Sequence, residues 1–346
     1  MTHDSQFNGP VWQLVDSRGI GGIESHVKGL SQALSDIGVD SRIVRINDYG
    51  AHPVFEKDAP VKQRALNGVA DTMARICLER PLLVHTHGYK AGIIGRLAAR
   101  ASRVPVVSTF HAGDRGAGLV RVYTFLDEAT ARLSPAMAVS EKIKTRIPHA
   151  RFAPNFTTVP PTLKDFHDGP VTFGFVGRFS EEKGVDRFCA LARSLPEARF
   201  IAFGDGPLAP ELKQRFSDCV AFAGVELDQD AIWSKVDVVC LPSRAEGLPM
   251  TALEAAARGV PILATPVGGL PDLLEAGGGW VADFVHDVWK ERMRAIAALP
   301  PGALACIGEQ GRAIVESQFS PAAGLDVVLS VYAEAGVRIR RHSNAA

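Results

Sequence analysis

Arg178 and Lys183 are the first residues whose types and spacing suggest chemistry. They stand five residues apart in the segment VGRFSEEKG, where an expected strand ends and an expected helix begins. Two cations placed across such a loop can converge on one diphosphate, the guanidinium as a planar fork of donors and the ammonium as a point charge. They could also pair with their acidic neighbours Glu181, Glu182 or Asp186. By itself, this loop leaves both interpretations open.

Glu246 and Glu254, eight residues apart, form a second candidate site in the segment LPSRAEGLPMTALE. Glu246 would lie in a loop after the apolar run DVVCL, and Glu254 two turns into the helix that follows. An ionised carboxylate accepts hydrogen bonds from sugar hydroxyls, and a helix N-terminus favours phosphate. The residues at that N-terminus are Gly247, Leu248, Pro249 and Met250. Two glutamates at this spacing are common by chance, so the prediction depends on their context.

Glycines also gather after the first expected strand, at positions 19, 21 and 22. Glycine lets backbone N–H groups approach a phosphate, and the following helix adds about half a positive charge at its N-terminus. A dinucleotide-binding fingerprint would need a glycine where this chain has Glu24, so a dehydrogenase is weakened without being excluded. A purely structural tight turn is the alternative. His111 ends the apolar run VPVVSTF, which suits a cleft residue as well as a structural histidine.

Metal-binding patterns receive little support. Asp228-Gln229-Asp230 has the D-x-D form of metal-dependent transferases, but it precedes an expected helix, where an aspartate caps the N-terminus. His85 and His87 could chelate an ion, but no third ligand stands near them in the sequence. The five cysteines include no C-x-x-C pair. The sequence therefore predicts no metal and no bound cofactor.

Strands alternate with helices along nearly the whole chain, which predicts an α/β protein with parallel sheets and crossover helices. Expected strands are 11–15, 41–46, 82–85, 104–109, 136–139, 171–176, 199–203, 220–223, 238–241, 261–264 and a short one near Trp280. The first expected helix begins at Ile23. The further expected helices are 60–78, 89–101, 119–132, 185–195, 209–216, 230–235, 249–258, 270–275 and 321–337. Ligands of such sheets bind outside the carboxyl ends of the strands.

Length and composition indicate two domains and narrow the functional classes. A chain of 346 residues exceeds the usual size of a single core, and the proline-rich stretch 153–170 is the best linker. We expect domains at 1–160 and 168–320, with a terminal helix at about 321–346 that packs back on the first. With 38 basic and 38 acidic residues, nucleic acid is not an expected partner.

The sequence also favours a cytoplasmic location. The start MTHDSQFNGP lacks the apolar run of a signal peptide, and scattered cysteines suit a reducing compartment. The basic, partly amphipathic stretch 140–146 leaves a peripheral contact with the inner membrane face open, beside the alternative of a solvated helix face.

Taken together, these motifs resemble a known family. The segments GGIESHV, STFHAGD, VGRFSEEKG, FGDGP and LPSRAEGLPMTALEAAARGVPILATPVGGLPD resemble the retaining glycosyltransferases of family 4, in the family's order and spacing. The resemblance covers nearly the whole chain and is more specific in the second half. It implies the GT-B fold, in which two doubly wound, Rossmann-like domains face a central cleft.

The resemblance also implies roles for the candidate residues. Glu246 and Glu254 would contact the donor sugar and the nucleotide ribose, while Arg178 and Lys183 would hold the diphosphate. Gly21 and Gly22 would line the phosphate or acceptor side, and His111 would reach the donor sugar. The donor-binding segment would extend through four residues already noted, Gly247, Leu248, Pro249 and Met250, and the pair Gly268-Gly269 would lie in the cleft.

The implied activity is transfer of a sugar from a nucleoside diphosphate, UDP before GDP, to a hydroxyl of a sugar or lipid-linked acceptor. Such chains commonly serve bacterial polysaccharide or glycolipid assembly. The sequence leaves three alternatives open: a nucleotide-sugar 2-epimerase of similar fold, an NAD-dependent oxidoreductase, and a sugar-nucleotide sensor without turnover.

Overall fold

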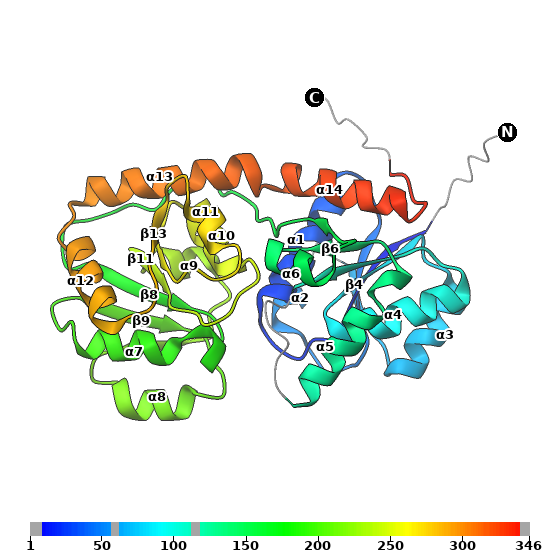
Figure 1. Cartoon of the computed structure of the whole chain (residues 1–346), viewed down its shortest axis with the longest axis horizontal. Coiled ribbons are helices and arrows are strands. Elements are labelled where there is room, and N and C mark those ends of the chain that lie inside the picture. Colours follow the sequence, from blue (N-terminus) through cyan, green and yellow to red (C-terminus); the bar gives the residue numbers. More distant parts are fainter. Residues whose placement is uncertain (1–8, 57–61, 112–117, 340–346) are drawn as a thin grey trace. The chain divides into compact units, whose positions relative to one another are not determined.

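The computed structural model describes residues 9–56, 62–111 and 118–339 (Figure 1). The chain divides into two compact units. Unit 1 comprises Met1–Pro154 together with Pro321–Ala346, and unit 2 comprises Asn155–Ser320. Between them, residues 153–171 contain neither helix nor strand. Each unit has its own parallel sheet and its own hydrophobic core.

The sheet of unit 1 has seven strands in the order β3-β2-β1-β4-β5-β6-β7. The strands are β1 (Val11–Val15), β2 (Ser41–Arg45), β3 (Lys62–Ala65), β4 (Leu83–His87), β5 (Val106–Phe110), β6 (Ala136–Ala138) and β7 (Arg151–Phe152). Strands β1, β4 and β5 are buried at every position, which explains their nearly continuous apolar runs. Polar residues inside such strands are therefore informative, and Gln13 of β1 lies opposite His85 of β4.

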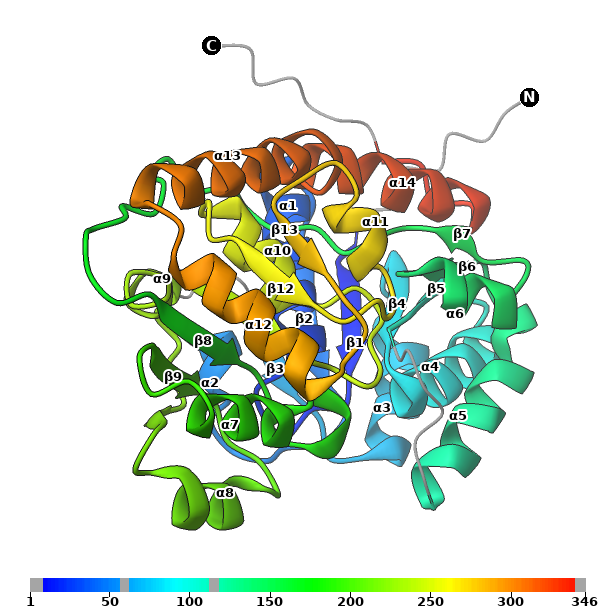
Figure 2. The same ribbon diagram turned by 60° about the vertical axis from the view of Figure 1, so that its left-hand side comes forward.

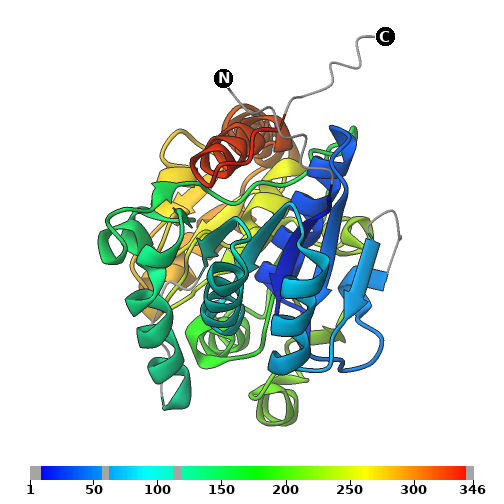
Figure 3. The ribbon, with the colours of Figure 1, turned by 90° about the vertical axis from the view of Figure 1, so that its right-hand side faces the viewer.

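Helices cover both faces of this sheet. They are α1 (Gly22–Asp36), α2 (Pro53–Glu56), α3 (Val69–Glu79), α4 (Tyr89–Ser102), α5 (Leu119–Ala129), η1 (Ala131–Leu133), α6 (Glu141–Arg146) and α14 (Pro321–Glu334). Helices α3 and α4 share a core with β1, β2 and β4. The last helix, α14, belongs to unit 1 although its sequence follows unit 2, and it packs against α1 (Figures 1 and 3).

Unit 2 has a six-stranded parallel sheet in the order β10-β9-β8-β11-β12-β13. Its strands are β8 (Thr172–Val176), β9 (Arg199–Phe203), β10 (Ala221–Gly224), β11 (Val238–Leu241), β12 (Ile262–Ala264) and β13 (Gly279–Val281). Its helices are η2 (Glu181–Lys183), α7 (Val185–Arg193), α8 (Ala209–Phe216), α9 (Gln229–Trp233), α10 (Met250–Ala257), α11 (Leu270–Leu274), α12 (His286–Ala297) and α13 (Pro301–Gln318).

Two hydrophobic clusters fill the two faces of the second sheet. One contains side chains of α7, α8 and α12, and the other contains side chains of α9, α10, α11 and α13. Figure 2 shows the ribbons of these helices around the strands of the sheet. Strand β11 contributes to both in alternation, with Val238 and Cys240 in the first cluster and Val239 and Leu241 in the second. This alternation is that of a strand buried on both sides. The prediction of two α/β domains, each with a parallel sheet, is confirmed.

The secondary-structure predictions fail in a few places. A helix over 60–78 is wrong at its start, because Lys62–Ala65 is strand β3, and residues 60 and 61 lie outside the described part of the chain. Strand β3 has no alternating apolar pattern, and its pairing with β2 at the sheet edge determines its conformation. Helices α12 and α13 were not anticipated. None of the helices in the described ranges is both long and apolar enough to cross a bilayer.

Candidate functional site

The order of strands in unit 2 creates a topological switch point between β8 and β11. Strands β9 and β10 extend the sheet on one side of β8, and β11 to β13 extend it on the other. The loops that follow β8 and β11 therefore leave the same sheet edge in opposite directions, and ligands of open α/β sheets bind at such a switch point. These two loops carry Arg178, Lys183 and Glu246.

Lys183 and Glu246 meet at this point. The Lys183 ammonium nitrogen lies 2.7 Å from Oε2 of Glu246, and the hydroxyl of Ser243 donates to Oε1 of the same carboxylate at 2.8 Å. The Glu246 side chain is 5% exposed and that of Lys183 32%. The ammonium of Lys183 and the hydroxyl of Ser243 compensate this buried carboxylate for the water it has lost. Lys183 therefore does pair with an acidic group, but with a different one from the neighbours that the sequence suggested.

A second ion pair fixes the two loops to each other. The guanidinium of Arg244 contacts both carboxylate oxygens of Asp186, at 2.8 and 2.7 Å. Burial alone would raise the pKa of Asp186, but the hydrogen bonds and charge of Arg244 outweigh it and lower that pKa. The backbone N–H of Arg244 also donates to the carbonyl of Glu182 at 2.7 Å. The loop that carries Glu246 is thus held against the loop that carries Lys183.

Glycines allow further close approaches around these loops. Gly184 has φ of +71°, and a Cβ there would lie 2.1 Å from the Pro242 carbonyl oxygen. Gly268 has φ of +62°, and its Cβ would lie 2.1 Å from the carbonyl oxygen of Gly247. The N–H of Gly269 donates to that same carbonyl at 2.7 Å. The pair Gly268-Gly269 therefore supports the backbone directly after Glu246.

The other donor-side candidates lie around the same loops. Arg178 is exposed, and its guanidinium forms no hydrogen bond or ion pair with any residue that the structure describes. Glu254 is 9% exposed, on helix α10. Helix α10 begins at Met250 with Pro249 as its N-cap, and Gly247 and Leu248 precede it, buried. Unit 2 thus brings Lys183 to a shielded carboxylate just before a helix N-terminus, with Arg178 on the same loop as Lys183.

Unit 1 has a corresponding switch point between β1 and β4. The loop after β1 contains Gly21, the N-cap of α1, and Gly22, the first residue of that helix. Within the same loop, the Ser17 hydroxyl hydrogen-bonds to the Glu24 carboxylate, and a Cβ on Gly21 would lie 2.8 Å from the other oxygen of Glu24. Burial raises the pKa of Glu24. An acidic side chain thus occupies the helix N-terminus where a dinucleotide would place its pyrophosphate, which argues against NAD binding.

His111 belongs to a cluster of imidazoles in unit 1. Its Nε2 lies 3.2 Å from Nδ1 of His87, and its ring contacts that of His26 at a centroid distance of 4.8 Å. Burial lowers the pKa of His26 to about 4 and holds those of His85, His87 and His111 well below the ordinary value. All four imidazoles are therefore neutral near pH 7. Residues 112–114 of the motif STFHAGD lie outside the described part of the chain.

Three of these histidines could in principle hold a metal ion. One ring nitrogen of each of His26, His87 and His111 lies within 4.8 Å of the others, and neutral imidazoles suit zinc. The ring nitrogens of His87 and His111 already hydrogen-bond to each other. His85 is not part of this set, because its nitrogens bond to Tyr332 and Thr109. Asp228 of the D-x-D motif caps helix α9 by accepting from two backbone N–H groups, as predicted.

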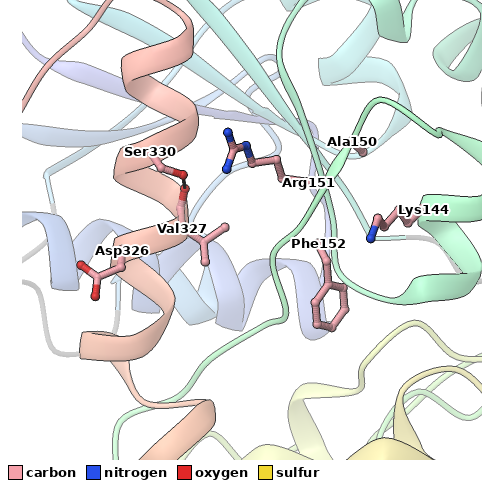
Figure 4. Close-up of a pocket in the computed structure, with 7 residues that line it drawn as sticks. All are labelled: Lys144, Ala150, Arg151, Phe152, Asp326, Val327 and Ser330. Carbon is pink, nitrogen blue, oxygen red and sulfur yellow. Dashed lines mark hydrogen bonds between the residues drawn. The ribbon is translucent and has the colours of Figure 1, made fainter.

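The basic stretch 140–146 is helix α6, with Ser140 as its N-cap. Two of its cations are ion-paired, Lys144 with Glu141 and Arg146 with Glu128. An open hollow beside it, drawn in Figure 4, is lined by Lys144, Ala150, Arg151, Phe152, Asp326, Val327 and Ser330. Arg151 of this lining is ion-paired with Glu334 of α14. The hollow includes none of the site residues predicted from the sequence.

Comparison with known proteins places both halves of the chain in one class of enzyme. The model of "Glycosyltransferase Family 4" matches residues 20–163, and that of "Glycosyl transferases group 1" matches residues 170–298. The chain is 34% identical to sulfoquinovosyl transferase of Arabidopsis thaliana over 102 residues, which are 29% of this chain and only 20% of that protein. It is 28% identical to a UDP-Gal:alpha-D-GlcNAc-diphosphoundecaprenol alpha-1,3-galactosyltransferase of Escherichia coli over 65% of this chain and 69% of that one.

Solved structures confirm the fold. The HepE protein of Anabaena, crystallised with UDP and glucose, matches with a TM-score of 0.78 and 18% identity over 93% of this chain and 99% of that one. At this identity the likeness concerns the fold alone. Sequence reasoning missed Ser243 at the Lys183–Glu246 pair. Around the imidazoles of unit 1, it missed Gln13, His26 and Tyr332. Gln13 had a signal, since it interrupts the apolar strand VWQLV, whereas nothing local marks Tyr332.

Proposed function

We propose that this chain, which belongs to the GT-B glycosyltransferases of family 4, transfers a sugar with retention from a UDP-sugar to a hydroxyl acceptor without a metal ion. The observation that carries the proposal is the loop pair at the β8/β11 switch point. There Lys183 and Glu246 form an ion pair, and Arg178 is exposed on the same loop as Lys183. This arrangement offers positive charge for a diphosphate and a carboxylate for sugar hydroxyls.

The proposed reaction needs charge stabilisation on the leaving group. The bond between the anomeric carbon and the diphosphate oxygen breaks, and the acceptor oxygen forms a new bond to that carbon on the same face. The acceptor's proton passes to the departing phosphate. Arg178 and Lys183 neutralise the negative charge that develops on the diphosphate, which is the role of a divalent ion in other transferases. Glu246 orients the sugar through its hydroxyls, and Glu254 binds the ribose.

Several observations support UDP as the nucleotide. The Escherichia coli relative is named for UDP-galactose, and the Anabaena structure contains UDP. The alternative of NAD is disfavoured by Glu24, whose carboxylate lies at the N-terminus of α1. The imidazole of His111, neutral and at the end of β5, would contact the donor sugar, and Gly21 and Gly22 would line the phosphate or acceptor side.

We further propose a cytoplasmic location and a sugar or lipid-linked acceptor of polysaccharide or glycolipid assembly. The acceptor named for the Escherichia coli relative is linked to a polyprenol diphosphate. Helix α5 supports a peripheral membrane contact more than α6 does, because it exposes large apolar side chains, with Leu119 at 77% and Phe125 at 63%. Binding of the purified protein to vesicles with and without anionic lipid, compared with a Phe125→Ser variant, tests this contact.

Isothermal titration calorimetry with UDP, GDP, ADP and NAD, in metal-free buffer, tests the donor site. We expect UDP to bind, and the Arg178→Ala variant to bind it more weakly. Tight binding of GDP instead would change the proposed base but not the reaction class. Binding of NAD alone would contradict the proposal and favour an oxidoreductase.

A further inference from the structure

A chain of buried hydrogen bonds in unit 1 leads to His111. It begins at Gln13 of β1, which is fully buried, and passes through His87 of β4, which is 1% exposed. The Gln13 carbonyl oxygen lies 2.9 Å from Nε2 of His87, and Nδ1 of His87 lies 3.2 Å from Nε2 of His111. Only His111, at the end of β5, retains some exposed surface.

The chemistry of these groups determines which atom donates and which accepts in each of these hydrogen bonds. A carbonyl oxygen only accepts hydrogen bonds, so His87 carries its proton on Nε2 and donates it to Gln13. A neutral imidazole has one N–H, so Nδ1 of His87 must be an acceptor. His111 then donates from Nε2, and its own Nδ1 holds a lone pair to which none of the described residues donates.

A second branch keeps the Gln13 amide in this orientation. Its nitrogen lies 3.4 Å from the Tyr332 hydroxyl, which lies 2.9 Å from Nδ1 of His85. Burial raises the pKa of Tyr332, so the phenol keeps its proton. The phenol oxygen accepts from Gln13 and its O–H donates to His85, whose Nε2–H then donates to Thr109 at 2.7 Å. Each buried donor in this branch therefore meets an acceptor.

We propose that Gln13 is a positioning residue that, acting through His87, holds His111 in the Nε2–H tautomer, so that Nδ1 of His111 accepts a hydrogen bond from a hydroxyl of the donor sugar. The tautomer follows from the hydrogen bonds alone. The role toward the sugar rests on the proposed function. Without Gln13, His87 can carry its proton on Nδ1 in place of Nε2. His87 then donates to Nε2 of His111, and His111 carries its own proton on Nδ1. His111 would then present an N–H where the sugar also presents a donor.

Nuclear magnetic resonance of protein labelled with 15N-histidine tests the tautomer directly, because protonated and unprotonated ring nitrogens differ strongly in chemical shift. We expect the Nε2–H form of His111 in the wild type. In Gln13→Met, which keeps a long unbranched side chain but no acceptor, we expect a mixture or the Nδ1–H form. The Nδ1–H form in the wild type, or an unchanged tautomer in Gln13→Met, would overturn the proposal.

Kinetics on the full-length protein provide a second readout, as release of UDP from UDP-glucose. We expect kcat of Gln13→Met to fall about tenfold with the Kd for UDP unchanged, because the proposed partner of His111 is the sugar and not the nucleotide. The matched control is Tyr332→Phe, which disturbs the same amide from the other side but leaves the bond to His87, and should lower kcat less than threefold. Equal losses in both variants would show a structural role only. If the wild type releases no UDP, UDP-glucose is not its donor, while the tautomer measurement still decides the network.

Discussion

The ammonium of Lys183 lies 2.7 Å from the carboxylate of Glu246, although the two residues are 63 positions apart in the sequence. The pairing exists because β8 and β11 are neighbours in the sheet and their loops leave the same edge. In the proposed complex, Lys183 would contact both the diphosphate and Glu246. Glu246 would contact both the sugar and Lys183. Nucleotide and sugar would therefore be held by one connected pair of charges.

Glu246→Ala should reduce turnover strongly and leave the affinity for free UDP nearly intact, because the proposed partner of this carboxylate is the sugar. The variant also releases Lys183 from its ion pair, so UDP binding has no reason to weaken. Calorimetry with UDP and steady-state rates with UDP-glucose measure the two effects separately. A loss of UDP affinity as large as the loss of turnover would assign Glu246 to the nucleotide.

Arg178→Ala should weaken UDP binding by about 1.5–3 kcal/mol, the usual effect of removing a charged hydrogen-bonding group. Its guanidinium forms no hydrogen bond or ion pair with a described residue, so the loss of affinity should come without a loss of folding stability. The matched control is Arg199→Ala, an exposed arginine at the first position of β9, the opposite end of the strands. Unchanged affinity in Arg178→Ala would remove Arg178 from the site.

Treatment with EDTA should leave activity unchanged, because in the proposed reaction Arg178 and Lys183 supply the positive charge that a divalent ion would provide. Asp228 of the D-x-D motif is engaged in capping α9. The measurement compares initial rates before and after EDTA and after return of Mg²⁺, Mn²⁺ or Zn²⁺. Loss of activity that one ion restores would contradict the prediction, and a response to zinc alone would direct attention to His26, His87 and His111.

Local sequence patterns predicted most of the fold. Strands 199–203 and 238–241 have the predicted bounds, because apolar runs flanked by polar turns are local signals. Helix α12 was missed although Trp289, Met293 and Ile296 recur at helical spacing, so its signal was present. Strand β3 had no such signal, since its sequence KQRA is mostly polar, and its conformation follows from its pairing with β2.

The candidate site was predictable in its members but not in its contacts. The loops around Arg178 and Glu246 are recognisable as segments, and the glycines mark close approaches. The pairing of Lys183 with Glu246, and the hydrogen bond from Ser243, depend on which strands are adjacent. The contact of Tyr332 with Gln13 joins residues 319 positions apart, and only the return of α14 to unit 1 creates it.

Arg96→Ala should destabilise the protein by roughly 3–5 kcal/mol, the usual cost of leaving a buried partner charge uncompensated. The Arg96 side chain is fully buried in α4 and donates to Ser108, Asp127 and Thr130. Removal would leave the Asp127 carboxylate, 9% exposed, without its cation. Urea unfolding followed by circular dichroism measures the change. The control is Arg100→Ala on the exposed side of the same helix, and a similar loss there would contradict the argument.

Lowering the pH from 7.5 to 5 should destabilise the protein through its buried histidines. Burial lowers the pKa of His26 from 6.5 to about 4, so the folded protein keeps this imidazole neutral while the unfolded chain takes up a proton. The unfolded state then binds more protons between these two pH values, and stability falls as pH falls through that window. By this linkage, His26 alone lowers the free energy of unfolding at pH 5 by roughly 2 kcal/mol relative to pH 7.5. Above about pH 7, where both states hold it neutral, the contribution is constant.

Urea unfolding midpoints at pH 7.5, 6 and 5 measure this effect, and the His26→Asn variant should show a shallower pH dependence than the wild type. His167 is the matched control, because its side chain is 77% exposed and its environment changes little on folding. His167→Asn should therefore keep the wild-type dependence. Equal slopes in the wild type and His26→Asn would mean that the folded protein accommodates a charged imidazole at position 26, and the neutral cluster around His111 would lose its physical basis.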